Sequence, residues 1–426
     1  MLLKSITDPA DLKKLSAAEL QQVSEEARTV LLEKISHHGG HNGPNLGVVE
    51  MTVALHAVFD SPRDKMIFDV SHQTYIHKML TGRGQAFWDP AHYSDVSGYT
   101  NPKESDHDLF TVGHTSTSLS LANGVAKARD LKNEEGNVIA VIGDGSLSGG
   151  LAYEGLNNIA ETGTNTIVIV NDNDQSIAEN HGGLYNNLRA LRDTNGQAEN
   201  KFFKSLGFDY YYLADGNDLT ALMHLFKQVK DSDHPVVLHI QTVKGKGFKF
   251  AEENREKFHA GGPFSLETGD YLANSGGETY STVTTDYLLE KMAQDPTVVA
   301  VNAGTPMILF TPEQRKIAGS QFVDVGIAEE HAATMTAGLA KNGAKPVWAV
   351  FSTFMQRSFD QISHDLSLNN VAGTILVYGA SAYGMNDESH LGIFDISFLS
   401  HIPNLVYLAP TNKEEYLAML DWSIDQ

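Results

Sequence analysis

The chain alternates short apolar runs with longer amphipathic or alanine-rich stretches. The apolar runs are rich in β-branched residues, which favour strands, so the alternation predicts an α/β protein with mostly parallel sheets flanked by helices. Near the N-terminus, Ser16 followed by Glu19 predicts a capping box that opens a helix running to about Ile35. The predicted strands are residues 138–142, 166–170, 236–240, 298–301, 347–351, 374–378 and 405–408.

One stretch near the middle of the chain differs in composition from its surroundings. It is rich in Gly, Ser and Thr and lacks a strong hydrophobic period, which is typical of a connection between domains. We therefore expect a first domain at 1–265, a linker at 266–281 and a second domain at 282–426.

Length and composition narrow the class of protein. With 426 residues, of which 41% are hydrophobic, the chain is long enough for two or three domains. No apolar run approaches the ~20 residues of a membrane-spanning helix, and cysteine is absent, so we expect a cytoplasmic protein without disulfides or thiolate sites. The net charge of −22 argues against nucleic-acid binding. Binding of a phosphorylated ligand would therefore require a local positive group, such as a metal ion, a helix N-terminus or a few cationic side chains.

Two polar turns follow consecutive predicted strands. Asp144 lies between Gly143 and Gly145 after the first of them, and Asn173 follows the next. In doubly wound sheets, ligands bind outside the carboxyl ends of strands, so the two turns share one crevice if their strands are neighbours. A Mg²⁺ ion bridging Asp144, Asn173, a backbone carbonyl near Gln175 and the oxygens of a diphosphate would suit these hard oxygen ligands. Either turn alone would be interpreted as an ordinary turn.

This pair of turns resembles the motif by which thiamine-diphosphate enzymes hold the cofactor through Mg²⁺. Further segments follow the order found in the 1-deoxy-D-xylulose-5-phosphate synthases, so the chain is identified as a member of this transketolase-like family. The resemblance implies two thiamine-diphosphate-binding domains, the first of the diphosphate-binding type and the second of the pyrimidine-binding type. The segments that carry it are residues 39–83, 112–128, 324–340, 351–365 and 390–410.

The resemblance also implies a carboxylate that activates the cofactor. The matching residue is Glu329, and not its neighbour Glu330, and it would contact the aminopyrimidine ring and favour loss of the thiazolium proton. A glutamate in an alanine-rich helix is usually solvated, but the apolar neighbours here indicate a buried segment. Phe354 matches the aromatic residue that stacks on the pyrimidine, although composition alone favours a place in the core.

Four of the 18 histidines match pocket positions of the family. They are His41, His72, His114 and His390, and their implied work is proton transfer to and from substrate oxygens. The implied catalytic residues are Glu329, His41, His72 and His390. The implied cofactor contacts are His72, Gly113, His114, Thr115, Gly143, Gly145, Ser146, Asn173, Ile327, Glu329 and Phe354. The implied substrate contacts are Arg357, His41, His390 and Asn386. The implied metal ligands are Asp144, Asn173 and the backbone of Gln175.

The family reaction would condense pyruvate with glyceraldehyde 3-phosphate, with loss of CO₂, to 1-deoxy-D-xylulose 5-phosphate. That product is a precursor of isoprenoids, thiamine and pyridoxal. The cofactor would act as the electron sink, while the protein orients and desolvates the substrates. Arg357 would hold the acceptor's phosphate, and the enzyme would be a homodimer.

Several positions depart from the family pattern. Pro263 replaces a lysine, Phe351 replaces a tyrosine, and Asn386 stands where a pocket aspartate is usual, in a stretch that also lacks an arginine. Because acceptor residues change while cofactor residues are kept, a transketolase-like paralogue with another donor or aldehyde is an alternative. A non-catalytic remnant that binds the cofactor or a partner is a third hypothesis.

The resemblance implies that the chain ends before the last strand of the second domain and before the family's third domain. We therefore expect the third transketolase-type domain to be absent from this chain. Three accounts stay open: a truncated or cleaved form, a split enzyme with a separate C-terminal chain, or a naturally reduced paralogue.

Overall fold

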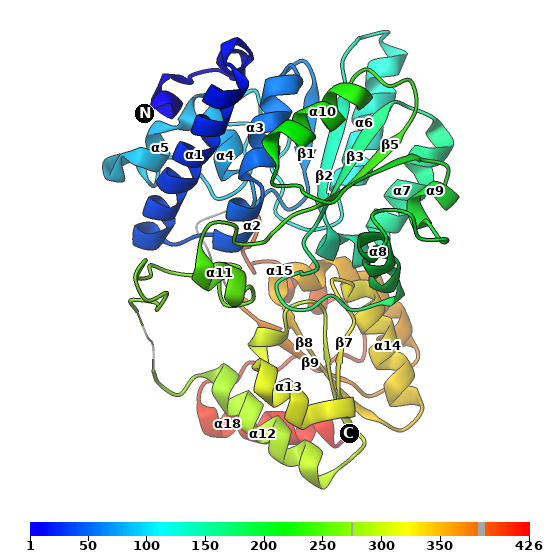
Figure 1. Cartoon of the computed structure of the whole chain (residues 1–426). Coiled ribbons are helices and arrows are strands. Elements are labelled where there is room, and N and C mark those ends of the chain that lie inside the picture. Colours follow the sequence, from blue (N-terminus) through cyan, green and yellow to red (C-terminus); the bar gives the residue numbers. More distant parts are fainter. Residues whose placement is uncertain (274–275, 382–387) are drawn as a thin grey trace. The chain divides into compact units, whose positions relative to one another are not determined.

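The structure is a computed structural model that describes residues 1–273, 276–381 and 388–426. It divides into two compact units, Met1–Asn274 and Ser275–Gln426 (Figure 1). The units are called unit 1 and unit 2 below, and each is described by itself.

The border between the units falls within the predicted linker, 266–281. The first residues of this stretch still belong to unit 1, because the backbone N–H of Leu272 donates to the carbonyl of Pro263. The helix that opens unit 2 begins at Tyr280. The predicted domain bounds, 1–265 and 282–426, stay predictions.

Unit 1 contains a five-stranded, fully parallel sheet in the order β1-β2-β3-β5-β4. Side chains along its central strands point alternately to the two faces of the sheet, and helices cover both faces. Ile139 and Val141 pack in the core shared with helices α1, α3 and α10, while Ala140 and Ile142 pack in the core shared with α6, α7 and α8. Burial on both faces explains the continuous apolar runs in the sequence. The strands are β1 (Lys65–Phe68), β2 (Val138–Gly143), β3 (Thr166–Asp172), β4 (Asp209–Leu213) and β5 (Val236–Gln241).

The helices of unit 1 connect these strands. The α-helices are α1 (Ala17–His38), α2 (Asn42–Gly47), α3 (Val49–Val58), α4 (Tyr75–Lys78), α5 (Gln85–Trp88), α6 (Ser118–Leu131), α7 (Gly150–Thr162), α8 (Gly183–Asp193), α9 (Phe202–Ser205), α10 (Leu219–Val229) and α11 (Lys249–Glu253). Shorter helical turns are η1 (Leu2–Ser5), η2 (Pro9–Lys14), η3 (Met79–Arg83), η4 (Pro90–His92) and η5 (Asp144–Ser148).

The predicted capping box at the start of α1 is confirmed. The Ser16 backbone N–H donates to the Glu19 carboxylate at 2.7 Å, and the Glu19 N–H donates to the Ser16 hydroxyl at 3.3 Å. Both contacts satisfy N–H groups that have no partner inside the helix. The helix ends at His38, slightly beyond the predicted Ile35.

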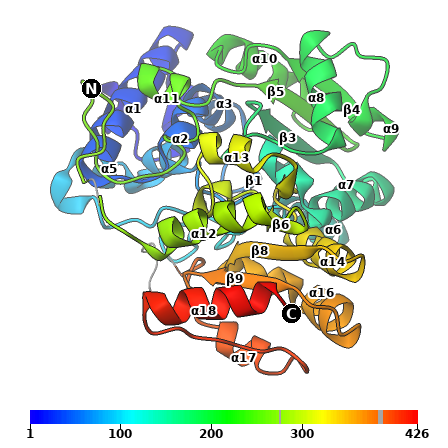
Figure 2. The same ribbon diagram turned by 90° about the horizontal axis from the view of Figure 1, so that it is seen from below.

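Unit 2 contains a four-stranded parallel sheet in the order β7-β6-β8-β9. Helices α12 and α18 pack on one face and α14 on the other (Figure 2). The strands are β6 (Val298–Asn302), β7 (Phe322–Asp324), β8 (Lys345–Phe351) and β9 (Thr374–Tyr378). The helices are α12 (Tyr280–Gln294), η6 (Pro306–Ile308), α13 (Pro312–Ala318), η7 (Gly319–Gln321), α14 (Glu329–Lys341), α15 (Ser352–Met355), η8 (Gln356–Ser358), α16 (Phe359–Gln361), η9 (Ile362–Leu368), α17 (Asp395–Leu399) and α18 (Lys413–Ile424).

The prediction of a strand at 405–408 is wrong. This segment has no regular structure, and Val406, Tyr407 and Leu408 are 61%, 43% and 38% exposed. A strand is stabilised by hydrogen bonds to a neighbouring strand, and β9 is the last strand on this side of the described sheet. Apolar β-branched composition alone therefore did not specify a strand here.

None of the helices in the described parts of the chain is both long enough and apolar enough to cross a membrane.

Candidate functional site

The two polar turns of unit 1 meet at the carboxyl edge of its sheet. Strands β2 and β3 are parallel neighbours, and their register pairs Gly143 with Asn171. The turn with Asp144 follows β2, and the turn with Asn173 follows β3. The backbone N–H of Gln175 donates to Oδ2 of Asp144 at 3.0 Å. The juxtaposition expected from the sequence is therefore present in the fold.

Asp144 is buried in this contact and lies close to a second acid. Burial, reinforced by the nearby Asp172 carboxylate, raises the pKa of Asp144 well above its usual value. The side-chain amide of Asn180 donates to Oδ2 of Asp144 at 2.7 Å. A cation at this position would offset the burial of the carboxylate. Sequence reasoning missed Asn180, which lies in the loop after β3 and belongs to no short motif.

Two amide oxygens at this edge have no hydrogen-bond partner among the residues that the structure describes. Oδ1 of Asn173 and Oδ1 of Asn180 are buried, and neither accepts a hydrogen bond from the residues that the structure describes. Buried polar atoms usually have partners, so their exceptions mark places where a ligand can bind. Open space surrounds Gly143, where an added Cβ would meet no heavy atom within 4 Å. These features fit a Mg²⁺ ion that carries a diphosphate.

A metal site made only of acidic and histidine side chains is not found here. Among the described residues, no group of three or more His, Cys, Asp or Glu could hold a metal ion. The group of oxygen atoms around Asp144 is of another kind, because it combines one carboxylate with amide oxygens. The remaining coordination positions of a metal ion would be filled by a ligand. The backbone N–H of Gln175 points at Asp144, and the role of its carbonyl stays a prediction.

The loop that carries Gly113, His114 and Thr115 is held beside the Asp144 turn. The buried carboxylate of Asp69, which follows β1, accepts hydrogen bonds from the backbone N–H groups of Ser116 at 2.8 Å and Ser118 at 3.1 Å. The Ser116 hydroxyl donates to the carbonyl of Ser146 at 2.8 Å. The cofactor residues Ser146 and Gly145 predicted from the sequence therefore adjoin this loop.

Three histidine rings cluster in unit 1. The ring centres of His41 and His72 lie 5.1 Å apart, and His259 lies 5.9 Å from His41 and 5.4 Å from His72. The sequence analysis selected His41 and His72 but missed His259. The only sequence signal for His259, which follows Phe258, is the resemblance to the family. Burial, with the nearby Lys244, lowers the pKa of His259 well below its usual value, so this imidazole stays neutral.

Two further buried residues lie near this histidine cluster. The Asn45 amide donates to the carbonyls of His41 at 2.8 Å and His72 at 2.7 Å. The Lys244 ammonium donates to the carbonyl of Ser176 at 2.5 Å, and burial lowers the pKa of Lys244 to about 7. A lysine with a pKa near neutrality can exist with or without its proton under physiological conditions. Neither residue was predicted from the sequence.

Unit 2 brings together four of its predicted site residues. Glu329 begins α14 and is 3% exposed, and its Oε2 lies 3.8 Å from Nη1 of Arg357. Burial, only partly opposed by the Arg357 charge, raises the pKa of Glu329 to about 7. The ring of Phe354 lies 5.5 Å from that of His390 and 5.9 Å from that of Phe351, edge to face in both pairs. Phe354 and Arg357 both follow the carboxyl end of β8.

Two further site residues were predicted in unit 2, and only one of them lies among the described residues. Ile327 lies in the turn before α14, and its side chain would contact a Cβ placed on Gly304 at 2.7 Å. That close approach explains a glycine with a φ of +74° at position 304. Asn386 lies outside the described residues.

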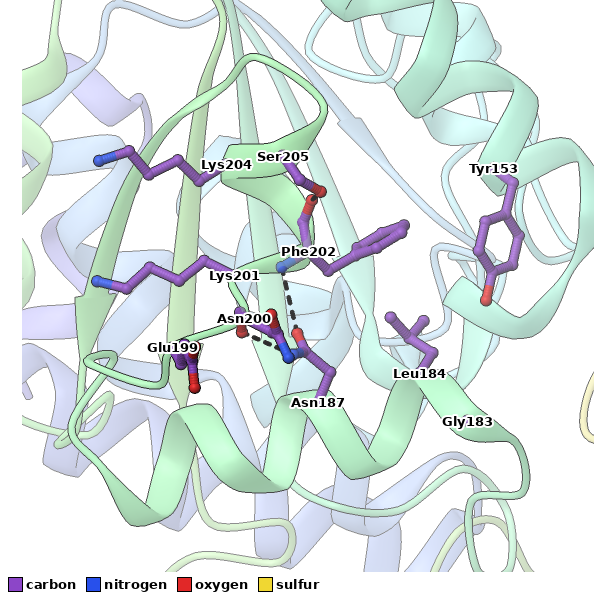
Figure 3. A pocket seen from close by; sticks show the side chains of 10 residues that line it. All are labelled: Tyr153, Gly183, Leu184, Asn187, Glu199, Asn200, Lys201, Phe202, Lys204 and Ser205. Carbon is purple, nitrogen blue, oxygen red and sulfur yellow. Dashed lines mark hydrogen bonds between the residues drawn. The ribbon is translucent and has the colours of Figure 1, made fainter.

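Unit 1 also has a cavity. It has a volume of about 730 Å³ and lies between α7, α8 and the segment leading into α9 (Figure 3). The Asn187 amide fixes this segment by donating to the carbonyl of Asn200 at 2.7 Å. Lys201 and Lys204 point away from the apolar side chains of the cavity. The cavity contains none of the predicted site residues.

Comparison with known proteins places this arrangement in a family. The family model described as 1-deoxy-D-xylulose-5-phosphate synthase matches residues 3–201 and 194–242, and the model of the transketolase pyrimidine-binding domain matches 278–426. A 1-deoxy-D-xylulose-5-phosphate synthase of Symbiobacterium thermophilum is 42% identical, over 99% of this chain and 70% of the relative. The chain belongs to the 1-deoxy-D-xylulose-5-phosphate synthase family. Its members are thiamine-diphosphate-dependent enzymes of the transketolase-type transferases.

A second relative agrees with this assignment. The 1-deoxy-D-xylulose-5-phosphate synthase of Caldanaerobacter subterraneus is also 42% identical, over 99% of the chain and 74% of the relative. Among solved structures, a transketolase from Campylobacter jejuni aligns over 96% of this chain and 77% of its own, with 16% identity and a TM-score of 0.47. As a member of the synthase family, the chain is a transferase with two α/β units, and the predicted fold class is confirmed.

Proposed function

We propose that the chain is a carboligase that condenses pyruvate with glyceraldehyde 3-phosphate, with loss of CO₂, to give 1-deoxy-D-xylulose 5-phosphate. The product would serve the synthesis of isoprenoids, thiamine and pyridoxal. The observation that carries the proposal is the meeting of the Asp144 and Asn173 turns at one sheet edge, with buried oxygens that accept no hydrogen bond from the described residues. Such a set suits Mg²⁺ and a diphosphate, which a thiamine-dependent member of this family requires.

In this proposal the two units have different roles. When bound, thiamine diphosphate supplies the electron sink that stabilises negative charge after decarboxylation. Asp144 and Asn173 would hold Mg²⁺, and the loop with Gly113, His114 and Thr115 would pack against the cofactor. Glu329 would hold a proton at the aminopyrimidine ring, and its pKa of about 7 suits proton exchange near neutrality.

The substrate groups would be handled by basic side chains. His41, His72 and His390 would move protons to and from substrate oxygens, since an imidazole accepts a proton when it is neutral and donates one when it is protonated. Arg357 would hold the phosphate of the acceptor, because a guanidinium donates paired hydrogen bonds to phosphate oxygens. Phe354 would stack on the pyrimidine. Homodimer formation, a cytoplasmic location and a separate C-terminal chain stay predictions.

A second candidate function is a transketolase-like reaction with another donor or aldehyde. The ring of Phe351 packs edge to face on Phe354, so a hydrocarbon ring stands where the family has a tyrosine hydroxyl. Loss of that hydroxyl removes one polar contact near the proposed substrate pocket. Pro263, which replaces a lysine, similarly removes a cation.

An aldehyde panel separates these two functions. The purified chain is incubated with thiamine diphosphate, Mg²⁺, pyruvate and one aldehyde at a time, phosphorylated or neutral, and the products are identified by mass. The synthase proposal predicts the highest kcat/KM with glyceraldehyde 3-phosphate. A higher value with a neutral or longer aldehyde would favour the paralogue instead.

A further inference from the structure

We propose that Arg192 is a positioning residue for the metal site, and that it acts by fixing both chain neighbours of Asn173. The inference rests on the Mg²⁺ and diphosphate part of the proposed function. Arg192 lies near the end of α8, it is far from Asn173 in sequence, and no motif selects it.

The contacts of the Arg192 guanidinium define the arrangement. Its Nη1 donates to both carboxylate oxygens of Asp172 at 2.8 Å, and its Nη2 donates to Oδ1 of Asp174 at 2.6 Å. Asp172 and Asp174 are the residues directly before and after Asn173. A planar guanidinium holds such a geometry with little freedom, which a lysine cannot reproduce.

Asp172 is fixed from further directions. His239 contacts its Oδ2 through Nε2 at 2.6 Å, and the backbone N–H of Thr242 donates to its carbonyl at 2.9 Å. The Asp172 side chain is fully buried, whereas the Asp174 side chain is 45% exposed. Asp174 has a φ of +60°, and its N–H donates back to Oδ1 of Asp172 at 3.0 Å. The turn around Asn173 is therefore held in a tight conformation.

Helix α8 also contacts the other turn of the proposed metal site. The Tyr185 hydroxyl donates to the carbonyls of Asp144 at 3.1 Å and Gly145 at 3.2 Å. Tyr185 and Arg192 are separated by about two helical turns, so both point from one face of α8. One rigid element thus holds both turns that carry the proposed metal ligands.

This arrangement predicts an effect on metal affinity. A ligand oxygen binds a metal more tightly when surrounding contacts already hold it in the binding geometry, because less freedom is lost on binding. Without Arg192, the turn would keep the contacts of Asp172 with His239 and Thr242 and that of Arg255 with the Asn173 carbonyl, but Asp174 would lose its guanidinium partner. Metal binding would then have to supply the remaining order of the turn. A purely stabilising ion pair would instead change the unfolding temperature and leave the affinity of the folded protein unchanged.

The test measures metal binding and needs no turnover. Mn²⁺ is titrated into the full chain at a fixed concentration of thiamine diphosphate, and free Mn²⁺ is followed by electron paramagnetic resonance. We expect Arg192→Leu to raise the Kd for Mn²⁺ at least about tenfold. Arg192→Lys should restore only part of the affinity. Arg189→Leu, at an exposed position of the same helix, is the matched control and should bind as the wild type does.

A second variant keeps the test valid if Arg192→Leu does not fold. Asp174→Asn removes the negative charge from one arm of the contact at a partly exposed side chain, and asparagine tolerates the positive φ. We expect a Kd for Mn²⁺ raised about threefold with an unchanged unfolding temperature. Wild-type affinity in folded Arg192 and Asp174 variants would overturn the positioning role alone. A wild-type chain that binds no Mn²⁺ with thiamine diphosphate would overturn the cofactor proposal together with this inference.

Discussion

The carboxylate of Glu329 lies 3.8 Å from the guanidinium of Arg357, too far for a hydrogen bond, and its Oε2 accepts none from the described residues. Burial therefore outweighs the attraction of the arginine, and the pKa of Glu329 rises to about 7 from 4.5. A buried acid with such a pKa exchanges its proton near neutral pH, which is the property a catalytic proton carrier needs.

The raised pKa of Glu329 predicts how stability depends on pH without cofactor. The folded state holds this proton more tightly than the unfolded state, so the contribution is complete below about pH 4.5 and is lost as the pH rises to about 7. The shift corresponds to roughly 3 kcal/mol. Urea unfolding followed by tryptophan fluorescence can measure this loss, because Trp348 is buried in the same unit.

The variant Glu329→Gln should flatten this pH dependence, since glutamine does not titrate. Glu330→Gln, at the neighbouring and more exposed position, should keep the wild-type slope. Parallel curves for the wild type and Glu329→Gln between pH 5 and pH 7 would show that Glu329 has an ordinary pKa.

The same substitution predicts a specific loss of activity. Glu329→Gln should lower kcat at least about 100-fold, because general acid and base groups contribute factors of this size. Binding of thiamine diphosphate through its diphosphate should change little, because Asp144 and Asn173 belong to unit 1. Steady-state kinetics and calorimetric titration measure the two effects. A Glu329→Gln enzyme with wild-type kcat would contradict the role assigned to this carboxylate.

Substitution of Asp144 should have opposite effects on stability and on cofactor binding. Asp144→Asn removes an ionisable group whose charged form is disfavoured by burial beside Asp172, and its side-chain oxygen can still accept from Gln175 and Asn180. The free energy of unfolding without metal should rise by about 1–2 kcal/mol. Mg²⁺-dependent binding of thiamine diphosphate should be lost. Thermal unfolding and calorimetry test the pair of effects, and retained Mg²⁺-dependent binding would remove Asp144 from the metal site.

The hydrogen bonds of Asn45 predict that this residue stabilises the histidine cluster. Asn45→Ala removes hydrogen bonds to the carbonyls of His41 and His72 and leaves the backbone N–H of Tyr75 without its acceptor. The free energy of unfolding should fall by about 2–3 kcal/mol. Asn158→Ala, which removes an exposed surface contact to Asn123, should cost much less. Equal losses in denaturant unfolding of the two variants would contradict this account.

Sequence patterns predicted the buried strands better than the edge ones. Strands β2 and β3 are continuous apolar runs because helices cover both faces of the sheet. Such runs can be recognised in the sequence without knowing which strands pair. Strand β4 (Asp209–Leu213) lies at the edge and is tyrosine-rich and half-exposed, so its pattern was not recognised. The segment 405–408 failed in the opposite way, since its composition favours a strand but no described strand pairs with it.

The site was predictable where residues lie in local motifs. Asp144 and Asn173 each follow a recognisable strand, and parallel topology alone brings their turns together. Asn180 and Arg192 reach the same region, and His259 reaches His41 and His72, through loops and a helix whose paths depend on packing. Their roles depend on contacts between distant parts of the chain, such as that of Arg192 with Asp172, and no spacing rule reports such contacts.

Release of CO₂ from pyruvate labelled at its carboxyl carbon tests the central claim most directly. The chain is incubated with thiamine diphosphate and Mg²⁺, with and without glyceraldehyde 3-phosphate, and the Glu329→Gln variant serves as the control. The account predicts CO₂ release that depends on the aldehyde, is matched by formation of 1-deoxy-D-xylulose 5-phosphate, and is lost in the variant. Absence of CO₂ release and of product from a wild-type chain that demonstrably binds the cofactor would contradict it.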